Sequence, residues 1–461
     1  MGRRASLILA LMLTACRGTE PTRVDAIVVG AGPAGLAAAW ELEQAGQRVV
    51  LVDGHDAVGG RARWGMGMSL MAGTSTQEAQ GVQDSPVRLL EDWESMTGAP
   101  ADAWEQGFVL AAPTQVHDWL AELGVRWDRL HPEVVTNTLR DHEPRGGSTS
   151  IVLALGSALA LEPRLGSWVT RLEPAKAGGW QVWLDGERQP AYAATQVILA
   201  TGSLYGNEQR ASEHDATSAC SMDALVDGKD GAVPPQADTL SMLAALSPAT
   251  SNMGALGLYP HVLAVDDHPY IDAHGAAVVD ATGARILETH ELNSIHAGRR
   301  VADQPECIAW AVFGQNSMPQ VLQQLTADRR DALLAQGQVL HTAEGAADLA
   351  AVLGMDPKIL AATLANAPVY RPQPGPIQRG QRPPFWAARL GLVAGKSFGG
   401  LQTDLEGRLL DQDGQPVPGL FAAGELAGMG GGGVGAPWGF DGSLSAVIHS
   451  GRVAGSHAAQ D

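Results

Sequence analysis

Cysteine is scarce in this sequence, since only Cys16, Cys220 and Cys307 occur among 461 residues. They form no Cys-x-x-Cys or Cys-x-x-Cys-His pattern, which argues against zinc, iron–sulfur and covalently attached haem sites. We therefore predict no metal site. Cys220 and Cys307 are far apart in the sequence, and we expect them to stay unpaired, with a disulfide between them as the alternative.

Aromatic residues and positive charge are also in short supply. There are 5 tyrosines and 6 phenylalanines, and the net charge is −19. Because a nucleic-acid-binding surface is basic, the charge predicts no nucleic-acid partner. Glycine, by contrast, is abundant at 56 residues, which suits tight turns and close helix–sheet packing. The chain is long enough for two or three compact units.

The sequence has no apolar run long enough to span a membrane, but its first residues resemble an export signal. A basic start precedes a short apolar stretch at residues 5–13, and Leu13-Thr14-Ala15-Cys16 resembles a bacterial lipobox. We expect cleavage before Cys16 and acylation of that residue, which would anchor the chain stably; an ordinary cleaved signal peptide is the alternative. The predicted location is the bacterial cell envelope, lipid-anchored and facing the periplasm or the exterior, with residues 1–16 as signal segment and 17–23 as tether.

A βαβ unit is predicted directly after the tether. Residues 25–29 form an apolar, β-branched run typical of a buried parallel strand, and residues 48–52 repeat that pattern. The intervening residues 33–45 favour a helix that ends at Gly46. Strand, helix and strand fit into about 30 residues, as they do in a βαβ unit.

A glycine motif, Gly30-x-Gly32-x-x-Gly35, lies between the first strand and the helix. In such a turn the second glycine lets a pyrophosphate approach the backbone, and the helix N-terminus offers N–H groups to the phosphates. Asp53 follows the second strand at the spacing of a carboxylate that binds ribose hydroxyls. These residues predict a dinucleotide site, which they leave open between FAD and NAD. The predicted contacts are Gly30, Ala31, Gly32, Pro33, Ala34, Gly35 and Asp53.

The far end of the chain favours FAD. Residues 418–425 form a strand that ends in Gly424-Glu425, and this segment resembles the second FAD motif of the glutathione-reductase-like flavoproteins. The resemblance implies that Glu425 binds the ribityl chain. A further helix opens at Ser443 and Leu444, and its N-terminus is expected to face the pyrimidine end of the flavin and to stabilise the negative charge of the reduced ring.

Beyond these two ends, the chain resembles the succinate dehydrogenase/fumarate reductase flavoprotein superfamily over nearly its whole mature length. The matching segments include Gly59-Gly60-Arg61, Ala72-Gly73-Thr74, and residues 119–125, 198–207, 276–285, 348–366 and 399–404. The resemblance implies an α/β fold: a Rossmann-like FAD-binding domain of glutathione-reductase type with an inserted α+β capping domain. We expect the FAD-binding domain at residues 24–247 and 385–461 and the cap at residues 248–384. Further expected FAD contacts are Gly59, Gly60, Arg61, Ala72, Gly73, Thr74, Val169, Ala200, Thr201 and Gly202.

The same resemblance implies hydride transfer between the flavin and a CH–CH group of a small molecule. However, the positions at which fumarate reductases carry Arg, His and Arg hold Leu292, Gly395 and Trp438. A dicarboxylate would lose charge-assisted hydrogen bonds worth about 1.5–3 kcal/mol each, so we predict that fumarate and succinate are not substrates. Aromatic residues expected near the flavin favour an uncharged or apolar substrate, as in the ketosteroid dehydrogenase branch. They are Phe385, Trp386, Phe398, Trp438 and Phe440.

The pattern does not fix the catalytic acid or base. The candidates by position are Lys396, Arg389, His290, Glu291 and Tyr259, with Arg140 and His142 as further groups of the flavin domain. Each is equally compatible with a structural role. Two other functions stay open: an FAD oxidase of amine-oxidase type and a non-catalytic FAD-binding lipoprotein. Because the chain has no haem or iron–sulfur motif, we expect a separate electron donor or acceptor, such as a quinone or a cytochrome.

Overall fold

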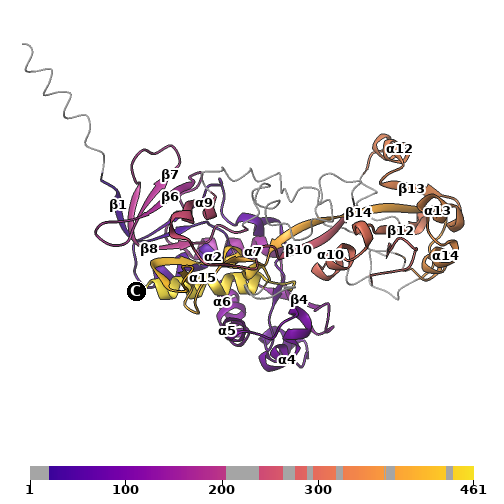
Figure 1. Cartoon of the computed structure of the whole chain (residues 1–461). Coiled ribbons are helices and arrows are strands. Elements are labelled where there is room, and N and C mark those ends of the chain that lie inside the picture. The colour runs from indigo at the N-terminus through magenta and orange to yellow at the C-terminus, as the bar shows by residue number, and fades with distance from the viewer. Residues whose placement is uncertain are drawn as a thin grey trace, which may run out of the picture.

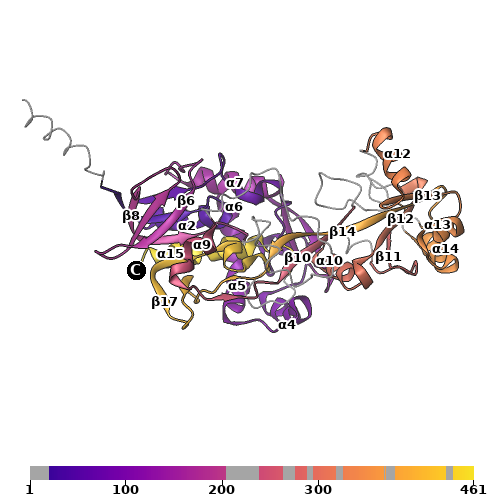
Figure 2. The same ribbon diagram turned by 45° about the horizontal axis from the view of Figure 1, so that its top comes forward.

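The computed structural model describes residues 20–203, 238–262, 276–287, 294–317, 325–367, 369, 379–431 and 440–461. In these ranges two lobes are joined by two strands that run side by side, β10 (Leu256–Val262) and β14 (Phe385–Ser397) (Figures 1 and 2). The predicted residues Cys16, His290 and Trp438 lie outside the described residues.

The larger lobe is built on a seven-stranded sheet with the order β16-β17-β8-β1-β2, to which β7 and β6 are added through β8. β1 pairs in parallel with β2 and β8, and β8 pairs in parallel with β17, so the predicted βαβ unit is confirmed. These strands are apolar because helices and loops cover them. Their bounds are β1 Thr22–Val29, β2 Val49–Val52, β6 Val169–Pro174, β7 Trp180–Leu184, β8 Tyr192–Leu199, β16 Arg408–Leu410 and β17 Pro416–Ala422.

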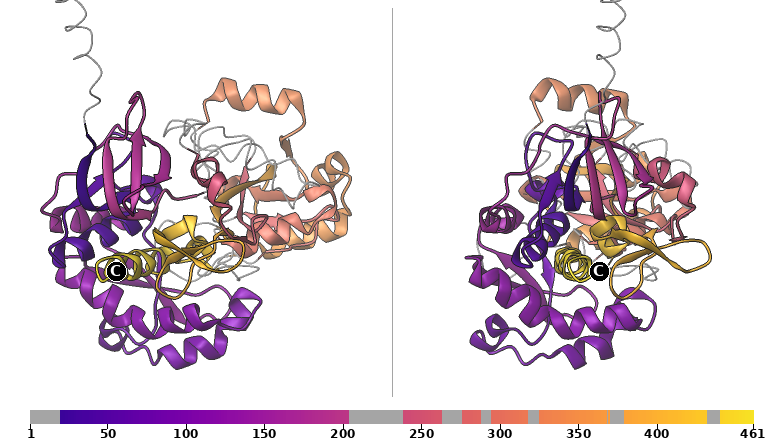
Figure 3. Two further views of the ribbon diagram at one scale, coloured as in Figure 1. Left: turned by 60° about the vertical axis from the view of Figure 1, so that its left-hand side comes forward. Right: turned by 90° about the vertical axis from the view of Figure 1, so that its left-hand side faces the viewer.

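Two helices from opposite ends of the chain, α2 (Pro33–Gln44) and α15 (Leu444–Ala458), pack against each other beside this sheet (Figure 3). The contact depends on small residues of α15. A Cβ atom on Gly451 would lie 2.1 Å from the Ala34 carbonyl oxygen, so no larger residue fits there. This packing places the last helix of the chain beside the Gly30–Gly35 turn.

A helical group and a small antiparallel sheet, ordered β3-β5-β4, complete the larger lobe. The central strand β5 pairs with β3 on one side and β4 on the other, so its side chains alternate between two buried environments. The bounds are β3 Ser69–Leu70, α3 Ser75–Ala79, α4 Pro86–Thr97, α5 Ala103–Ala112, a π-helical turn Pro113–Asp118, α6 Trp119–Glu122, β4 Trp127–Pro132, β5 Leu139–Pro144 and α7 Gly147–Ala158.

The smaller lobe is an α+β unit, as expected for the cap. Its five-stranded sheet has the order β10-β14-β12-β11, and β13 also pairs with β14. Successive residues of β12 face two separate apolar cores, with Phe313 in one and Val312 in the other. The remaining bounds are β11 Ala277–Val279, α10 Ile295–Ala302, β12 Trp310–Gly314, α12 Ala327–Gln336, β13 Leu340–Ala343, α13 Ala346–Leu353 and α14 Pro357–Asn366.

The expected boundary of the cap at residue 384 differs from what the structure shows. β14 begins at Phe385 and pairs with β12 and β13, and further along with β10 up to Ser397. The strand therefore belongs to the sheet of the smaller lobe, and the chain enters the larger lobe near Ser397. The expected boundary followed from the proline-rich residues 370–384 of the sequence. Strand pairing is a long-range property, and such a local signal does not report it.

The remaining short elements are α9 Thr239–Leu243, β9 Thr250–Ser251 and β15 Gly400–Leu401, and the last two pair with each other.

One cysteine differs from expectation. Cys307 is disulfide-bonded, so the prediction that this residue stays unpaired is wrong. Distance along the sequence does not limit which thiols meet in the folded chain. Among the residues that the structure describes, no helix has the length and apolar character needed to cross a membrane.

Candidate functional site

The Gly30–Gly35 turn has the steric properties of a dinucleotide-binding turn. Gly30 has φ +104°, and a Cβ atom there would lie 2.3 Å from the Ala200 carbonyl oxygen. A Cβ on Gly35 would lie 1.8 Å from the Gly30 carbonyl oxygen, whereas one on Gly32 would meet only open space. Two glycines thus fix the turn, and the third leaves the backbone accessible, which fits a pyrophosphate at the start of α2.

Asp53 and the Gly59-Gly60 doublet adjoin this turn. The Asp53 carboxylate accepts hydrogen bonds from Ala31 N (2.6 Å) and His55 N (2.8 Å). Gly59 N donates to the Ala31 carbonyl oxygen at 2.7 Å. A carboxylate has about four lone-pair sites, so Asp53 keeps acceptor capacity for ribose hydroxyls.

The predicted C-terminal FAD motif meets the N-terminal one. Glu425 Oε1 accepts a hydrogen bond from Ser397 N (2.7 Å) and lies 4.0 Å from Arg61 Nη1. A Cβ atom on Gly424 would lie 2.9 Å from Ala34 Cβ, so this turn also touches α2. The structure therefore brings Arg61, Gly424 and Glu425 together beside the first turn of α2.

The loop that follows β3 lies against the start of α15. Leu70 N donates to the Gly442 carbonyl oxygen (2.8 Å), and the Ser445 hydroxyl donates to the Leu70 carbonyl oxygen (2.9 Å). This pairing places the predicted residues Ala72, Gly73 and Thr74 near the predicted Ser443 and Leu444. The described backbone thus unites both ends of the expected flavin environment.

Thr74 is buried and is held by a neutral histidine. Its Oγ1 lies 2.8 Å from His142 Nε2, and His142 Nδ1 lies 2.7 Å from the Arg140 carbonyl oxygen. Burial lowers the pKa of His142 to about 4, with the nearby His117 adding to this effect. At neutral pH the uncharged ring donates from Nδ1 to Arg140, so Nε2 accepts a hydrogen bond from the Thr74 hydroxyl.

The remaining predicted FAD contacts are divided between the sheet edge and the core. Ala200 ends β8 and its N–H donates to the Val29 carbonyl oxygen at 2.8 Å, which places Ala200, Thr201 and Gly202 next to the Gly30 turn. Thr201 Oγ1 lies 2.8 Å from Thr239 Oγ1. The Val169 side chain, in contrast, packs in an apolar core of the larger lobe.

Two of the predicted catalytic residues lie together where the lobes meet. The Tyr259 hydroxyl donates to Asp441 Oδ1 at 3.0 Å, and Lys396 Nζ lies 4.0 Å from the same oxygen. Lys396 Nζ also lies 3.4 Å from the Phe440 carbonyl oxygen, and Ile295 N donates to Asp441 Oδ2 at 3.3 Å. The side chains of Lys396 and Asp441 are each 21% exposed. Asp441 precedes Ser443 by two residues, so this group, which we call the Tyr259–Asp441–Lys396 cluster, adjoins the start of α15.

A buried carboxyl group, Asp141 of β5, lies next to this cluster. The residue is 4% exposed, and among the described residues its Oδ1 has no hydrogen-bond partner. Burial raises the pKa of Asp141 well above its ordinary value; the negative charges of Asp441 and Glu133 add to the rise, and Lys396 opposes it. Sequence analysis missed both Asp141 and Asp441. The available signal was three consecutive polar residues, 140–142, in a strand that borders the flavin loop.

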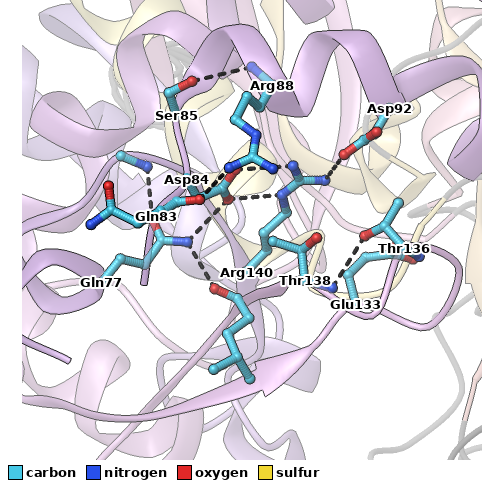
Figure 4. A network of polar contacts seen from close by, with 12 residues as sticks. Gln77, Gln83, Asp84, Ser85, Arg88, Asp92, Glu133, Thr136, Thr138 and Arg140 are labelled. Atoms are coloured by element: carbon cyan, nitrogen blue, oxygen red, sulfur yellow. Dashed lines mark hydrogen bonds and ion pairs between the residues drawn. The ribbon is translucent and has the colours of Figure 1, made fainter. Parts of the chain in front are cut away.

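Arg140 and Asp84 occupy the opposite side of β5 (Figure 4). The Arg140 side chain is 1% exposed and the Asp84 side chain 0%. Arg140 Nε and Nη2 donate to Asp84 at 2.8 and 3.0 Å, and Nη1 lies 2.7 Å from Asp92 Oδ2. Burial disfavours the charge, yet the bonds to Asp84 and Asp92 keep the Arg140 pKa above its usual value. This arginine is engaged in holding the fold together.

Other residues that the sequence placed near the flavin lie elsewhere. Arg389 pairs with Trp310 in the middle of β14, seven residues from Lys396 and thus about 23 Å away along the strand. Phe385 and Trp386 lie further still and pack in the cores of the smaller lobe. Phe398 packs with Tyr259 and Ile295.

Phe440 adjoins the cluster but faces the core. Its ring meets Trp93 edge to face at 5.2 Å between centroids, and the side chain is buried. Of the four aromatic residues predicted near the flavin that the structure describes, it thus brings Phe398 and Phe440 to the cluster, both as packing residues. Within the described ranges, no group of three or more His, Cys, Asp or Glu residues is arranged to hold a metal ion.

Comparison with known proteins agrees with this geometry. The protein-family model described as "FAD binding domain" matches residues 25–436. An NADH:fumarate oxidoreductase of Klebsiella pneumoniae is 26% identical over 470 residues, which cover 95% of this chain and 48% of that protein. A KsdD-like steroid dehydrogenase of Mycobacterium tuberculosis is 26% identical over 564 residues, covering 96% of this chain and 97% of that one. The chain therefore spans about half of the first relative and nearly all of the second.

A solved structure shows the same fold. The 3-ketosteroid-Δ4-(5α)-dehydrogenase of Rhodococcus jostii RHA1 superposes with a TM-score of 0.71 at 22% identity, covering 97% of this chain and 99% of that one. At this identity the likeness concerns the fold alone. It confirms the predicted FAD-binding domain with an inserted cap.

Proposed function

The chain belongs to the FAD binding domain family, and we propose that this FAD-dependent oxidoreductase acts on a CH–CH group of an uncharged, largely apolar small molecule. Its relatives include proteins named for steroid dehydrogenation and for fumarate reduction. The charges around the Tyr259–Asp441–Lys396 cluster favour the first kind of substrate over the second. Electrons would pass to or from a separate partner, such as a quinone or a cytochrome.

The residues that would hold FAD are contributed by both ends of the chain. The start of α2 with Gly32 suits the pyrophosphate, Asp53 suits the ribose, Glu425 with Arg61 suits the ribityl side, and the start of α15 suits the pyrimidine end. Bound FAD supplies a carrier that accepts or donates a hydride at N5. The protein must supply the accompanying proton and exclude a competing charge.

The Tyr259–Asp441–Lys396 cluster is the observation that carries the proposal. Hydride transfer at one carbon of a CH–CH pair requires proton transfer at the other, and a phenol hydroxyl beside a carboxylate can perform it. Asp441 accepts the Tyr259 hydrogen bond, and Lys396 balances the charge of Asp441. Because Lys396 is already paired with Asp441, binding a substrate carboxylate there would leave Asp441 uncompensated. An uncharged substrate avoids that penalty.

The first test uses the purified full chain loaded with FAD. Under anaerobic conditions a saturated 3-ketosteroid should bleach the visible flavin band, while succinate should not. Tyr259→Phe keeps the ring and removes the hydroxyl, so it should slow bleaching by about 10²–10⁴-fold while leaving FAD content unchanged.

Other outcomes select other functions. Bleaching by succinate would overturn the uncharged substrate. Stoichiometric peroxide release in air, with no turnover with quinone or cytochrome acceptors, would favour an FAD oxidase. A flavin that dithionite reduces but that no substrate or dye perturbs would favour a non-catalytic binding protein. Wild-type speed in Tyr259→Phe would remove Tyr259 from the mechanism.

We also propose that the chain is exported and acylated at Cys16. The basic start, the short apolar stretch and the lipobox-like residues 13–16 support this. The disulfide-bonded state of Cys307 independently supports the export, though not the acylation, because disulfides persist mainly outside the cytoplasm. After expression with its own signal, the wild type should sediment with membranes and Cys16→Ala should not. Equal solubility of both would contradict lipid anchoring.

A further inference from the structure

The position of Asp141 is fixed by the turn that follows Asp441. Gly442 has φ +77°, and a Cβ atom there would lie 2.3 Å from Asp141 Oδ1 and 2.8 Å from Leu70 N. Only glycine fits this position. The Asp141 oxygen consequently lies against the backbone of the residue that directly follows Asp441.

The groups that face Asp141 come from three elements and are mainly negative. Asp441 precedes α15, Glu133 follows β4, and Lys396 lies on β14. The Glu133 side chain accepts hydrogen bonds from Val135 N (2.9 Å) and Thr136 N (2.7 Å). Two carboxylates thus oppose a charge on Asp141 and one ammonium favours it.

One more titratable pair lies on the same small sheet. His131 of β4 stands opposite Asp141 in register, and its Nε2 is 2.6 Å from Glu143 Oε2. Those two side chains satisfy each other. Burial and the surrounding carboxylates raise the pKa of Asp141 well above its ordinary value, which favours the protonated form of its carboxyl group.

Among the described residues Asp141 Oδ1 has no hydrogen-bond partner, and this requires an explanation, because buried polar atoms in native proteins almost always have partners. Arg140, its neighbour in sequence, forms ion pairs with Asp84 and Asp92 instead. The protonated form of this carboxyl group is favoured, one of its oxygens has no hydrogen-bond partner among the described residues, and it adjoins an acid–base cluster. Such a group is suited to proton exchange.

We propose that Asp141 is a positioning residue that stores a proton for the Tyr259–Asp441–Lys396 cluster. The inference rests on the proposed function. In the reductive direction, bound FAD would supply the hydride for one substrate carbon, and the neighbouring carbon would gain the proton of the Tyr259 hydroxyl. Tyr259 is reprotonated through Asp441, so the O–H bond of Asp141 breaks while an O–H bond forms on Asp441. Asp141 then recovers a proton from solvent, and the oxidative direction reverses each step.

The test uses the FAD-loaded full chain and begins with infrared spectroscopy, which needs no substrate. The wild type should show C=O absorption from protonated carboxylic acids at neutral pH, including a share from Glu105, whose pKa burial raises to about 7. Asp141→Asn should remove one component, the Asp141 band, and leave the Glu105 component in place. Asp25→Asn is the matched control and should retain both components, since Asp25 is an exposed carboxylate whose pKa is lowered by hydrogen bonds to Arg48.

The second readout is the pH profile of turnover or of flavin reduction by substrate. Asp141→Asn should lower the rate about 10²-fold and abolish the loss of rate seen in the wild type when Asp141 ionises at high pH. FAD content should not change. If Asp141→Asn does not fold, Glu133→Gln serves in its place, because removing one negative charge should make the infrared band titrate at lower pH.

Each failure is distinguishable. A spectrum that loses no C=O component in Asp141→Asn, or shows none that moves in Glu133→Gln, overturns the stored proton. An active wild type whose pH profile is unchanged by Asp141→Asn overturns the relay alone. A wild type that shows the band but whose flavin responds to no CH–CH substrate overturns the proposed function, and the relay with it.

Discussion

Arg140 and Asp141 are neighbours on β5, both almost completely buried, yet their surroundings differ. Arg140 has two carboxylate partners, Asp84 and Asp92, and its charge is retained. Asp141 has an oxygen without a partner among the described residues, and burial raises its pKa well above the ordinary value. The comparison teaches that burial alone does not mark a functional residue. A better indication is a buried ionisable group that lacks part of its hydrogen-bond or charge partners and lies next to other acid–base groups.

Two histidines of the larger lobe repeat this comparison with the other sign of charge. His142 uses both ring nitrogens, toward Thr74 and the Arg140 carbonyl oxygen. His449 of α15 lies among Trp104 and Phe108, and its Nδ1 has no partner in the described part of the chain. Burial lowers the pKa of each to about 4. Partners therefore decide where the ring points, while burial decides its charge.

The largest expected effect comes from breaking the compensated side of β5. Arg140→Met leaves Asp84 buried without its cation, so the free energy of unfolding should fall by about 3–5 kcal/mol. Urea unfolding monitored by tryptophan fluorescence measures this. The double variant Arg140→Met with Asp84→Asn should recover part of the loss, because no charge then remains buried. A single variant as stable as the wild type would show that Asp84 is solvated after all.

A smaller effect for each single group is expected from acid. His142 and His449 bind protons in the unfolded chain below the ordinary pKa of 6.5 but in the folded chain only near 4. The contribution of each neutral ring to the free energy of unfolding is therefore fully present above pH 6.5. It is lost as the pH falls toward 4, by up to about 3 kcal/mol for each ring. Urea unfolding at several pH values should show this decline.

His449→Gln sharpens the acid comparison, since it should remove one ring's share of the loss of stability in acid.

Asp141 acts in the opposite sense. Its folded pKa is raised, so its contribution to stability is present below its ordinary value of 3.8 and is lost as the pH rises. Asp141→Asn should accordingly gain stability relative to the wild type with rising pH. A decline in acid that is equally steep in His449→Gln would locate the proton uptake elsewhere.

The smallest expected effect on stability concerns a cation that is only partly buried, Arg452. Arg452 pairs with Glu41 at 2.5 Å, and its guanidinium lies 4.3 Å from the Trp119 ring centroid and 5.5 Å from that of Trp40. Arg452→Lys keeps the charge but loses the planar stacking, so thermal unfolding should report a loss of about 1 kcal/mol. A loss of stability as large as that of Arg140→Met would contradict this expectation, because it would mean that partial exposure of a cation does not reduce the cost of replacing it.

Much of the FAD site could be predicted because its rules are local. The roles of Gly30, Gly32 and Gly35 follow from backbone geometry within one turn, and the structure shows the expected close approaches at the first and third glycine. The fold class and the cofactor followed from two such motifs, and the comparisons confirm both. Tyr259 and Lys396 were found only as members of a longer set of candidates.

The rest of the candidate site could not be predicted, because it depends on which distant strands meet. Arg389 and Lys396 looked equivalent in the sequence, yet seven residues along an extended strand separate them by about 23 Å. Asp141 and Asp441 are 300 positions apart in the numbering and carry no motif. No local pattern reports that both adjoin Gly442.

The sequence by itself determined the dinucleotide turns, the FAD cofactor and the α/β architecture, since these depend on residues a few positions apart. The tertiary structure decided which charges are compensated. Arg140, His142 and Asp141 are consecutive polar residues in the chain, and only the alternation of β5 between two differently populated sides sends the first two toward partners and the third toward Asp441. Electrostatic energies depend on distance in space and on exclusion of water, and neither is a property of distance along the chain.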